Sequence, residues 1–231
     1  MWPVRRLGRM IAEMSKAGVS IDRIAYILDS EEEKDKPGAL TPDMHADIEF
    51  SHVTFAYGEG REVLSDISFR IPRGTVLGIL GSTGSGKSTL MHLLCRLYDM
   101  PPENGKITVG GVDIADMRAA WVRENIGIVL QEPFLFSRTL AENVRIASPD
   151  STEEELWCAA QAACLESTIR GFTQGWETLV GERGVTLSGG QKQRTAIARM
   201  LMRNSPIMIL DDSLSAVDTE TDERIRHALK L

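Results

Sequence analysis

Near its middle the chain reads Gly81-Ser82-Thr83-Gly84-Ser85-Gly86-Lys87-Ser88, between an apolar segment, Thr75 to Leu80, and a segment of helical character, Thr89 to Leu97. The stretch fits G-x-x-x-x-G-K-[ST] in the strand, loop and helix context that the motif requires. Glycines permit backbone angles that other residues resist, so a run of N–H groups at a helix start can surround phosphate oxygens. A plain glycine-rich turn is the alternative. The stretch predicts a phosphate-binding loop, with a charge from Lys87 and a hydroxyl from Ser88 for Mg²⁺.

Two adjacent carboxylates follow a second apolar run of strand length. Ile207 to Leu210 comes after Pro206 and ends in Asp211 and Asp212. In open α/β sheets, ligands gather at the carboxyl ends of the strands. Such a pair is often only a turn signal, but behind a phosphate loop we expect Asp211 to hold Mg²⁺ through water.

A second helix start suited to phosphate lies at Leu187-Ser188-Gly189-Gly190-Gln191. Ser188 can cap the following helix, and the two glycines let backbone N–H groups approach an anion closely. Taken alone, the stretch reads as an ordinary loop. A chain with its own phosphate loop has no need of a second one, so the stretch implies a partner.

Together these motifs resemble the nucleotide-binding domain of ABC transporters, from about Asp47 to Leu231. The resemblance implies a P-loop NTPase fold of the α/β class. It implies a parallel core sheet, an N-terminal antiparallel β subdomain, and a helical subdomain, about residues 132–190, that carries the signature toward another chain. It also implies ATP and Mg²⁺, with ATP bridging two such domains.

The resemblance implies a set of site residues. The nucleotide would be bound by Tyr57, Gly81, Ser82, Thr83, Gly84, Ser85, Gly86, Lys87, Ser88, Thr89, Gln131, Ser188, Gly189, Gly190 and Gln191. The metal would be held by Ser88, Gln131 and Asp211, and the catalytic residues would be Asp212, Gln131 and Lys87. Tyr57 stands 24 residues before Gly81, where the family stacks a ring on adenine, although a half-buried strand tyrosine would look the same.

Two further segments resemble contact regions of the family. Val180-Gly181-Glu182-Arg183-Gly184 is similar to the segment that meets the intracellular loops of exporters. Ser215-Ala216-Val217-Asp218 is similar to the loop that crosses the dimer interface.

Two departures from the family pattern limit the expected activity. The family places a glutamate after the first carboxylate, where Asp212 stands here. A side chain one methylene shorter misplaces the carboxylate by about 1 Å, which can cost on the order of 100-fold in rate. We expect slow hydrolysis at this chain's own site, as in the degenerate half of a heterodimeric exporter; a compensating backbone shift is the alternative.

The second departure is that the chain stops at Leu231, before the family's next strand and its histidine. His227 does not replace that histidine, because no strand separates it from Asp218. In the family the missing strand lies between the strand leading to the phosphate loop and the strand ending in Asp211. We therefore expect the isolated chain to be poorly stable and to lack coupled ATPase activity.

The coarse pattern alternates strands with helices, which predicts a parallel α/β core. Strands are expected at Ile48 to Tyr57, Ile67 to Ile71, Thr75 to Leu80, Lys106 to Val109, Ile126 to Leu130 and Ile207 to Leu210. Helices are expected at Thr89 to Leu97, Leu140 to Arg145, Thr152 to Cys164, Gly189 to Arg203 and from Thr219 onward.

The N-terminal thirty residues predict an amphipathic helix. Its apolar stripe consists of Leu7, Met10, Met14, Ala17, Ile21, Ile24 and Leu28, and its polar side carries Arg5, Arg6, Arg9, Lys16 and Arg23. The stripe resembles the segment that leaves the last membrane helix of an ABC exporter, and basic residues are typical of cytoplasmic flanks. A surface helix packed on the domain is the alternative. Residues 31–46 read as a linker.

Composition agrees with an ordinary globular domain of 231 residues, 42% hydrophobic and 26% charged. The net charge of −7 argues against nonspecific nucleic-acid binding. The three cysteines, Cys95, Cys158 and Cys164, form no C-x-x-C pair, which suits a reducing compartment. No run of 18 apolar residues occurs, so the sequence predicts no membrane span.

The sequence therefore predicts the ATP-hydrolysing portion of an ABC exporter at the cytoplasmic face of the membrane. Its partners would be a second such domain, in a homodimer or in the heterodimer that Asp212 favours, and the transmembrane domain of the same polypeptide. A non-hydrolysing ATP clamp with a regulatory role is the alternative. A DNA-repair ATPase is disfavoured, because only 106 positions separate Gly81 from Leu187 and leave no room for a long coiled-coil insertion. The cargo is not encoded here.

Overall fold

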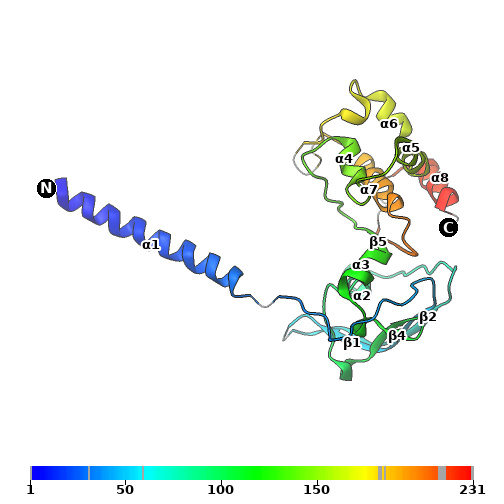
Figure 1. Ribbon diagram of the computed structural model, residues 1–231, viewed down its shortest axis with the longest axis horizontal. Helices are drawn as coiled ribbons and strands as arrows, with labels where there is room; N and C mark the ends of the chain where they lie inside the picture. The colour runs from blue at the N-terminus through cyan, green and yellow to red at the C-terminus, as the bar shows by residue number, and fades with distance from the viewer. Residues whose placement is uncertain are drawn as a thin grey trace. The chain divides into compact units, whose positions relative to one another are not determined.

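The computed structural model describes residues 2–30, 32–58, 60–181, 184, 186–212 and 217–229, with side chains omitted at 2–9, 11 and 12. It divides into two compact units, Met1–Asp35 and Lys36–Leu231. The first unit contains α1 (Trp2–Leu28), the long helix in Figure 1. The described members of its apolar stripe from Met10 to Leu28 are exposed. In the described part of the chain, no helix is both long and apolar enough to cross a membrane.

The second unit begins with a four-stranded antiparallel sheet in the order β2-β1-β3-β4. Its strands are β1 (Ile48–Ala56), β2 (Glu62–Ile71), β3 (Lys106–Val109) and β4 (Val112–Asp113). Phe50 of β1 faces Phe69 of β2 and Ile107 of β3, and its ring stacks on Phe69 with centroids 4.5 Å apart. The sequence predicts a strand from Ile67 to Ile71. The observed strand β2 begins earlier, because β1 continues to pair with it as far as Glu62. This sheet is the antiparallel subdomain that the sequence predicts.

The parallel part of the structure is a pair of strands, β5 (Ile126–Val129) and β6 (Ile207–Leu210). Val129 is in register with Leu210, and the N–H of Asp211 donates to the carbonyl of Val129 at 2.9 Å. The residues that follow the two strands, Gln131 and Asp211, therefore emerge at the same end of the pair. The predicted positions of both strands are confirmed within one residue.

The predicted strand from Thr75 to Leu80 is wrong for this structure. The segment has no strand assignment and all six residues are exposed, Leu80 by 96%. Among the described residues, β5 and β6 form a two-stranded sheet to which this segment does not belong. A strand is stabilised by its ladder of hydrogen bonds to a neighbour, and an apolar sequence without such a neighbour stays irregular.

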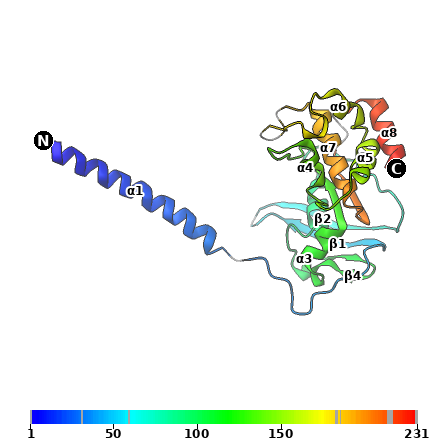
Figure 2. The same ribbon diagram turned by 45° about the horizontal axis from the view of Figure 1, so that its top comes forward.

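In the Lys36–Leu231 unit the helices gather in two lobes (Figure 1). One lobe holds α2 (Lys87–Leu94) and α3 (Ala119–Asn125) beside the antiparallel sheet. The other holds α4 (Leu140–Arg145), α5 (Glu153–Ala162), α6 (Glu166–Gly171), α7 (Gly189–Met202) and α8 (Thr219–Leu229). Short 3₁₀ turns lie at η1 (Pro102–Asn104), η2 (Ile114–Asp116) and η3 (Gly175–Glu177). Figure 2 shows the same grouping after rotation.

The expected helices need correction at α2, and two further helices, α3 and α6, were not expected. The helix predicted at Thr89 to Leu97 starts two residues earlier and ends at Leu94, because Arg96 has a φ of 50° and cannot continue a right-handed helix. The helices α3 and α6 lie outside the expected set. Neither has a side-chain cap at its start, whereas α4, which is comparably short, begins with the capping box of Thr139 and Glu142.

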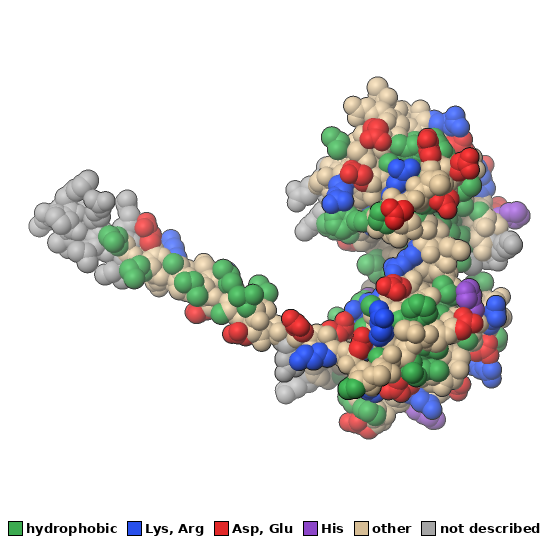
Figure 3. Space-filling model, in the orientation of Figure 1, with side chains coloured by type: hydrophobic (Ala, Val, Ile, Leu, Met, Phe, Trp, Pro, Cys, Tyr) green, Lys and Arg blue, Asp and Glu red, His purple; other side chains and the backbone are tan. Residues whose placement is uncertain are grey.

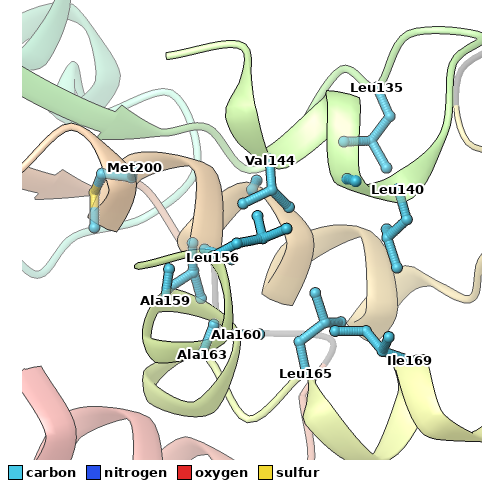
Figure 4. Packing of buried hydrophobic residues seen from close by; sticks show 14 of the residues in the cluster. Leu135, Leu140, Val144, Leu156, Ala159, Ala160, Ala163, Leu165, Ile169 and Met200 are labelled. Carbon is cyan, nitrogen blue, oxygen red and sulfur yellow. The ribbon is translucent and has the colours of Figure 1, made fainter. Parts of the chain in front are cut away.

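Each lobe has its own buried cluster. The cluster of the helical lobe, shown in part in Figure 4, includes Leu140, Val144, Leu156, Leu165 and Ile169, all almost completely buried. Burying each such side chain is worth about 1.5–3 kcal/mol.

The parallel strands join the two clusters. Val129 of β5 packs in the helical lobe, whereas Ile126 and Ile209 pack in the lobe of the antiparallel sheet. The two clusters meet at β5 and β6, beside the predicted carboxylates.

The surface of the second unit is charged. Figure 3 shows charged side chains of both signs interspersed over one face of the Lys36–Leu231 unit.

Candidate functional site

The phosphate loop is shaped by glycines that no other residue can replace without strain. Gly84 and Gly86 have φ angles of 81° and 88°. A Cβ atom on Gly86 would lie 2.7 Å from Cδ2 of Leu64 and 3.0 Å from the carbonyl oxygen of Val63. Because Gly86 immediately precedes α2, the loop turns directly into a helix whose N–H groups face an incoming anion.

Lys87 lies across this loop. Its Nζ donates to the carbonyl oxygens of Gly81 and Ser82, at 2.8 Å each. The first residue of α2 thus keeps its charge at the loop, where a phosphate group would be attracted.

Ser88 and Asp211 meet at the carboxyl end of β6. The hydroxyl of Ser88 donates to Oδ2 of Asp211 at 2.8 Å. Hydroxyl and carboxylate oxygens are ligands that Mg²⁺ prefers, and this ion commonly completes its shell with water and substrate phosphates. The part of the chain that the structure describes contains no cluster of three or more His, Cys, Asp or Glu residues suited to a metal. Ser88 and Asp211 together supply one hydroxyl and one carboxylate, a donor set that fits a magnesium ion whose other ligands are water and the phosphates of a nucleotide.

Gln131 and Asp212 form a second pair at the same edge. Nε2 of Gln131 donates to Oδ2 of Asp212 at 3.4 Å, and both side chains are exposed. Asp212 has a φ of 47°, which is unusual for a residue other than glycine. The chain thus turns sharply after β6 and presents the second carboxylate to the end of β5.

Tyr57 lies just beyond β1 and is 40% exposed. Its hydroxyl is 3.0 Å from Oγ1 of Thr89 on α2, and its ring meets Phe55 edge-on with centroids 5.1 Å apart. The ring is accessible on the side that these contacts leave open. One helix therefore carries the predicted metal ligand Ser88 and, next to it, the anchor of Tyr57.

Ser188 caps α7, as the sequence predicts. Its Oγ accepts from the N–H of Gln191 at 3.3 Å, and Oε1 of Gln191 accepts from the N–H of Ser188 at 2.9 Å. Gly189 and Gly190 form the first turn of the helix. Ser188 to Gln191 belong to the helical lobe, whereas α2 packs in the other cluster, so the two predicted phosphate sites lie in different lobes.

Some predicted contact residues lie outside the described part of the chain, namely Glu182, Arg183, Ser215 and Ala216. Of the described residues in the same two segments, Val180 is buried. Asp218 accepts from the N–H of Thr221 at 2.9 Å at the start of α8. This backbone hydrogen bond lowers the pKa of the Asp218 carboxyl.

Asn143 and Arg199 support the site but are not predicted from the sequence. The side chain of Asn143, fully buried, accepts from the N–H of Phe136 at 2.9 Å and donates to the carbonyls of Phe136 and Thr139. Arg199 of α7 donates to the carbonyl of Phe134 and to that of Asn143, both at 2.8 Å. Burial lowers the pKa of Arg199. Asn143 and Arg199 together fix the loop that follows Gln131. The sequence does not predict this role, because a single polar residue within a helical pattern does not indicate which distant backbone groups it contacts.

A family model described as "ABC transporter" matches residues 64–215. The chain is 43% identical over 230 residues to the putative multidrug export ATP-binding/permease protein YgaD of Bacillus subtilis (strain 168), covering 98% of this chain and 39% of that protein. It is 41% identical over 232 residues to the ATP-dependent lipid A-core flippase of Haemophilus influenzae (strain 86-028NP), covering 99% and 39% respectively.

A solved structure is also similar. It is a bacterial Atm1-family ABC exporter with ATP bound, with a TM-score of 0.85 and 35% sequence identity over 96% of this chain and 39% of that one. The chain thus spans about two fifths of the length of these proteins. The antiparallel sheet and the helical lobe agree with these matches. The chain belongs to the ABC transporter family.

Proposed function

We propose that the chain is the ATP-binding and ATP-hydrolysing portion of an ABC exporter. The contact between Ser88 and Asp211 behind a glycine-shaped loop is the observation that carries the proposal. It joins the phosphate loop to the carboxylate strand and leaves Lys87 at the same loop. These are the parts that phosphoryl transfer needs for binding and charge neutralisation.

Hydrolysis would depend on positioning. The loop N–H groups and Lys87 hold the β- and γ-phosphates, and Ser88 with Asp211 supplies oxygen ligands to Mg²⁺, which would neutralise phosphate charge when bound. Asp212 orients a water molecule for attack on the γ-phosphorus, with Gln131 beside it. The new bond forms between the water oxygen and phosphorus as the bond to the bridging oxygen breaks.

The signature would serve a second nucleotide-binding domain. Ser188 and Gly190 present a capped helix start in the lobe that does not contain this chain's phosphate loop. In a dimer they would close on the γ-phosphate held by the other chain. The similarity to an export ATP-binding/permease protein and to a lipid flippase supports a transmembrane domain in the same polypeptide and a place at the cytoplasmic face of a membrane. The exposed apolar stripe of α1 supports the proposal that α1 continues from such a domain.

The test compares Lys87→Ala with Lys106→Ala, a substitution of an exposed lysine on β3. ATP affinity is measured by calorimetry, and hydrolysis is measured as phosphate release from the full-length transporter. We expect Lys87→Ala to weaken ATP binding at least about 10-fold and to abolish hydrolysis at this site, and Lys106→Ala to leave both unchanged. Equal ATP affinity in Lys87→Ala and wild type would contradict the proposal.

A second function is favoured by one observation, the aspartate at the position of the water-orienting carboxylate. With the shorter Asp212, the chain's own site would hold ATP as a clamp while a partner's site turns over, which would also suit a heterodimer. Converting Asp212→Glu in the full-length pair distinguishes the two roles. A large gain in phosphate release supports the clamp, whereas an unchanged rate supports a site that is already competent.

A further inference from the structure

A second tyrosine lies against the predicted adenine-binding ring. Tyr98 follows the end of α2 by four residues, and its ring meets Tyr57 edge to face, with centroids 5.0 Å apart and planes at 81°. Tyr98 also approaches Phe55 at 5.9 Å and His92 at 6.1 Å. Phe55 is 5% exposed and belongs to the buried cluster, so the group rests on a fixed base.

Three contacts therefore fix the orientation of Tyr57. Its hydroxyl is tied to Thr89, and its ring is met by Phe55 and by Tyr98, both nearly at right angles. A tyrosine just past the end of a strand would otherwise turn about its side-chain bonds, and fixing it in advance reduces the entropy lost when a ligand stacks on it. Of the contacts, Tyr98 is the one that comes from outside both β1 and α2.

We propose that Tyr98 is a positioning residue for the nucleobase: its ring holds Tyr57 in the orientation in which adenine stacks. This inference rests on the proposed function, in which ATP binds at this site. Tyr98 is 45% exposed, so its ring contributes to the surface beside Tyr57 rather than to the buried core. It acts through Tyr57, and not on the phosphates, which are held by the other end of α2.

The size of the effect follows from the strength of an aromatic pair. Such pairs contribute enough beyond their buried area to change a binding constant by about 2- to 10-fold. We expect Tyr98→Leu to weaken ATP binding by that factor, because leucine keeps apolar bulk but has no ring edge. We expect Tyr98→Phe to bind ATP like the wild type, because the phenyl ring retains the contact and no hydrogen bond of the hydroxyl is needed.

The experiment measures dissociation constants of the full-length transporter for ATP and for inorganic tripolyphosphate, which has no base. Leu97→Ala is the matched control, since Leu97 is the adjacent residue, is 51% exposed and has no ring. Thermal unfolding of each variant is measured in parallel. A purely structural role of Tyr98 would weaken both ligands together, whereas a positioning role weakens ATP alone.

A double-mutant cycle with Tyr57→Ala tests whether Tyr98 acts through Tyr57. We expect Tyr57→Ala combined with Tyr98→Leu to bind ATP as weakly as Tyr57→Ala alone. Additive losses would overturn the proposal, and so would unchanged ATP affinity in Tyr98→Leu or an equal loss for tripolyphosphate. If the wild-type chain binds neither ligand, the proposed function itself fails; if it binds ATP but Tyr98→Leu has no effect, only this inference fails.

Discussion

The hydroxyl of Ser88 lies 2.8 Å from Oδ2 of Asp211, although the two residues are 123 positions apart in the chain. Ser88 stands in the first turn of α2, and Asp211 directly follows β6. The contact joins the start of α2 to the carboxyl end of β6, where the parallel strand β5 also ends. It defines where a nucleotide-bound cation would be shared between loop and strand.

Removing the hydroxyl should affect nucleotide binding only when Mg²⁺ is present. We expect Ser88→Ala to weaken MgATP binding about 10-fold and to leave binding of ATP in excess EDTA nearly unchanged, because the serine supplies a metal ligand and no phosphate contact of its own. Calorimetric titration with and without Mg²⁺ checks this. Ser51→Ala on β1, which removes a serine hydroxyl outside the nucleotide-binding set, is the control, and an equal loss for Ser88→Ala in EDTA would contradict the assignment.

We expect the cap of α7 to have two roles that mutations can separate. It stabilises the helix, and it contributes to the association of two nucleotide-binding domains. Ser188→Ala removes the acceptor of the Gln191 N–H and should cost about 1 kcal/mol of unfolding free energy. Thr152→Ala removes an equivalent capping box from α5 and should cost a similar amount. Only Ser188→Ala should reduce ATP-dependent association of two nucleotide-binding domains, measured by analytical ultracentrifugation. Equal association in the two variants would refute the role of Ser188 at a shared site.

The loop after Gln131 should depend on Asn143 for its stability. Asn143→Leu leaves the N–H of Phe136 without its acceptor and removes one of the partners of Arg199, so we expect a loss of about 2–4 kcal/mol in denaturant unfolding. Asn125→Leu is the control, since the amide of Asn125 donates to the carbonyl of Trp121 within its own helix region rather than to a distant loop. That variant should lose only about 1 kcal/mol. A loss for Asn143→Leu no larger than for the control would show that the buried network contributes little.

The thiol of Cys95 should make stability fall in alkaline solution. Burial raises the pKa of this thiol from 9.0 to about 11. The unfolded chain therefore releases the proton first, and the stabilisation present below pH 9 is lost as the pH rises toward 11. The loss is on the order of 2–3 kcal/mol.

Unfolding measured between pH 8 and 11 checks this prediction. Cys95→Ala should flatten the alkaline part of the curve, and Cys158→Ala, at an exposed position, should leave it unchanged. An identical pH dependence for Cys95→Ala and wild type would rule out the thiol as the cause.

Local chemistry was predictable where a residue's neighbours in the sequence decide its conformation. The capping of α7 by Ser188 depends on residues only three positions away, and the glycines before Lys87 are required by the backbone of a single turn. The parallel strands β5 and β6 were predictable from their short apolar runs. The resemblance to ABC transporters extended this to the antiparallel sheet and the helical lobe.

Prediction failed where the outcome depends on distant partners. Thr75 to Leu80 has the composition of a strand, yet no neighbour in the described chain pairs with it. The roles of Asn143 and Tyr98 come from contacts with residues of other elements, and nothing in their own segments marks them.

The sequence by itself determined the phosphate loop, the cap of α7 and the family, because each is set by residue types at fixed short spacings. Only the tertiary structure decided that Ser88 meets Asp211, that Tyr57 is held by Thr89 and Tyr98, and that Arg199 fixes the loop after Gln131. Those contacts depend on how strands and helices pack, and packing is a property of the whole buried interior rather than of any one segment.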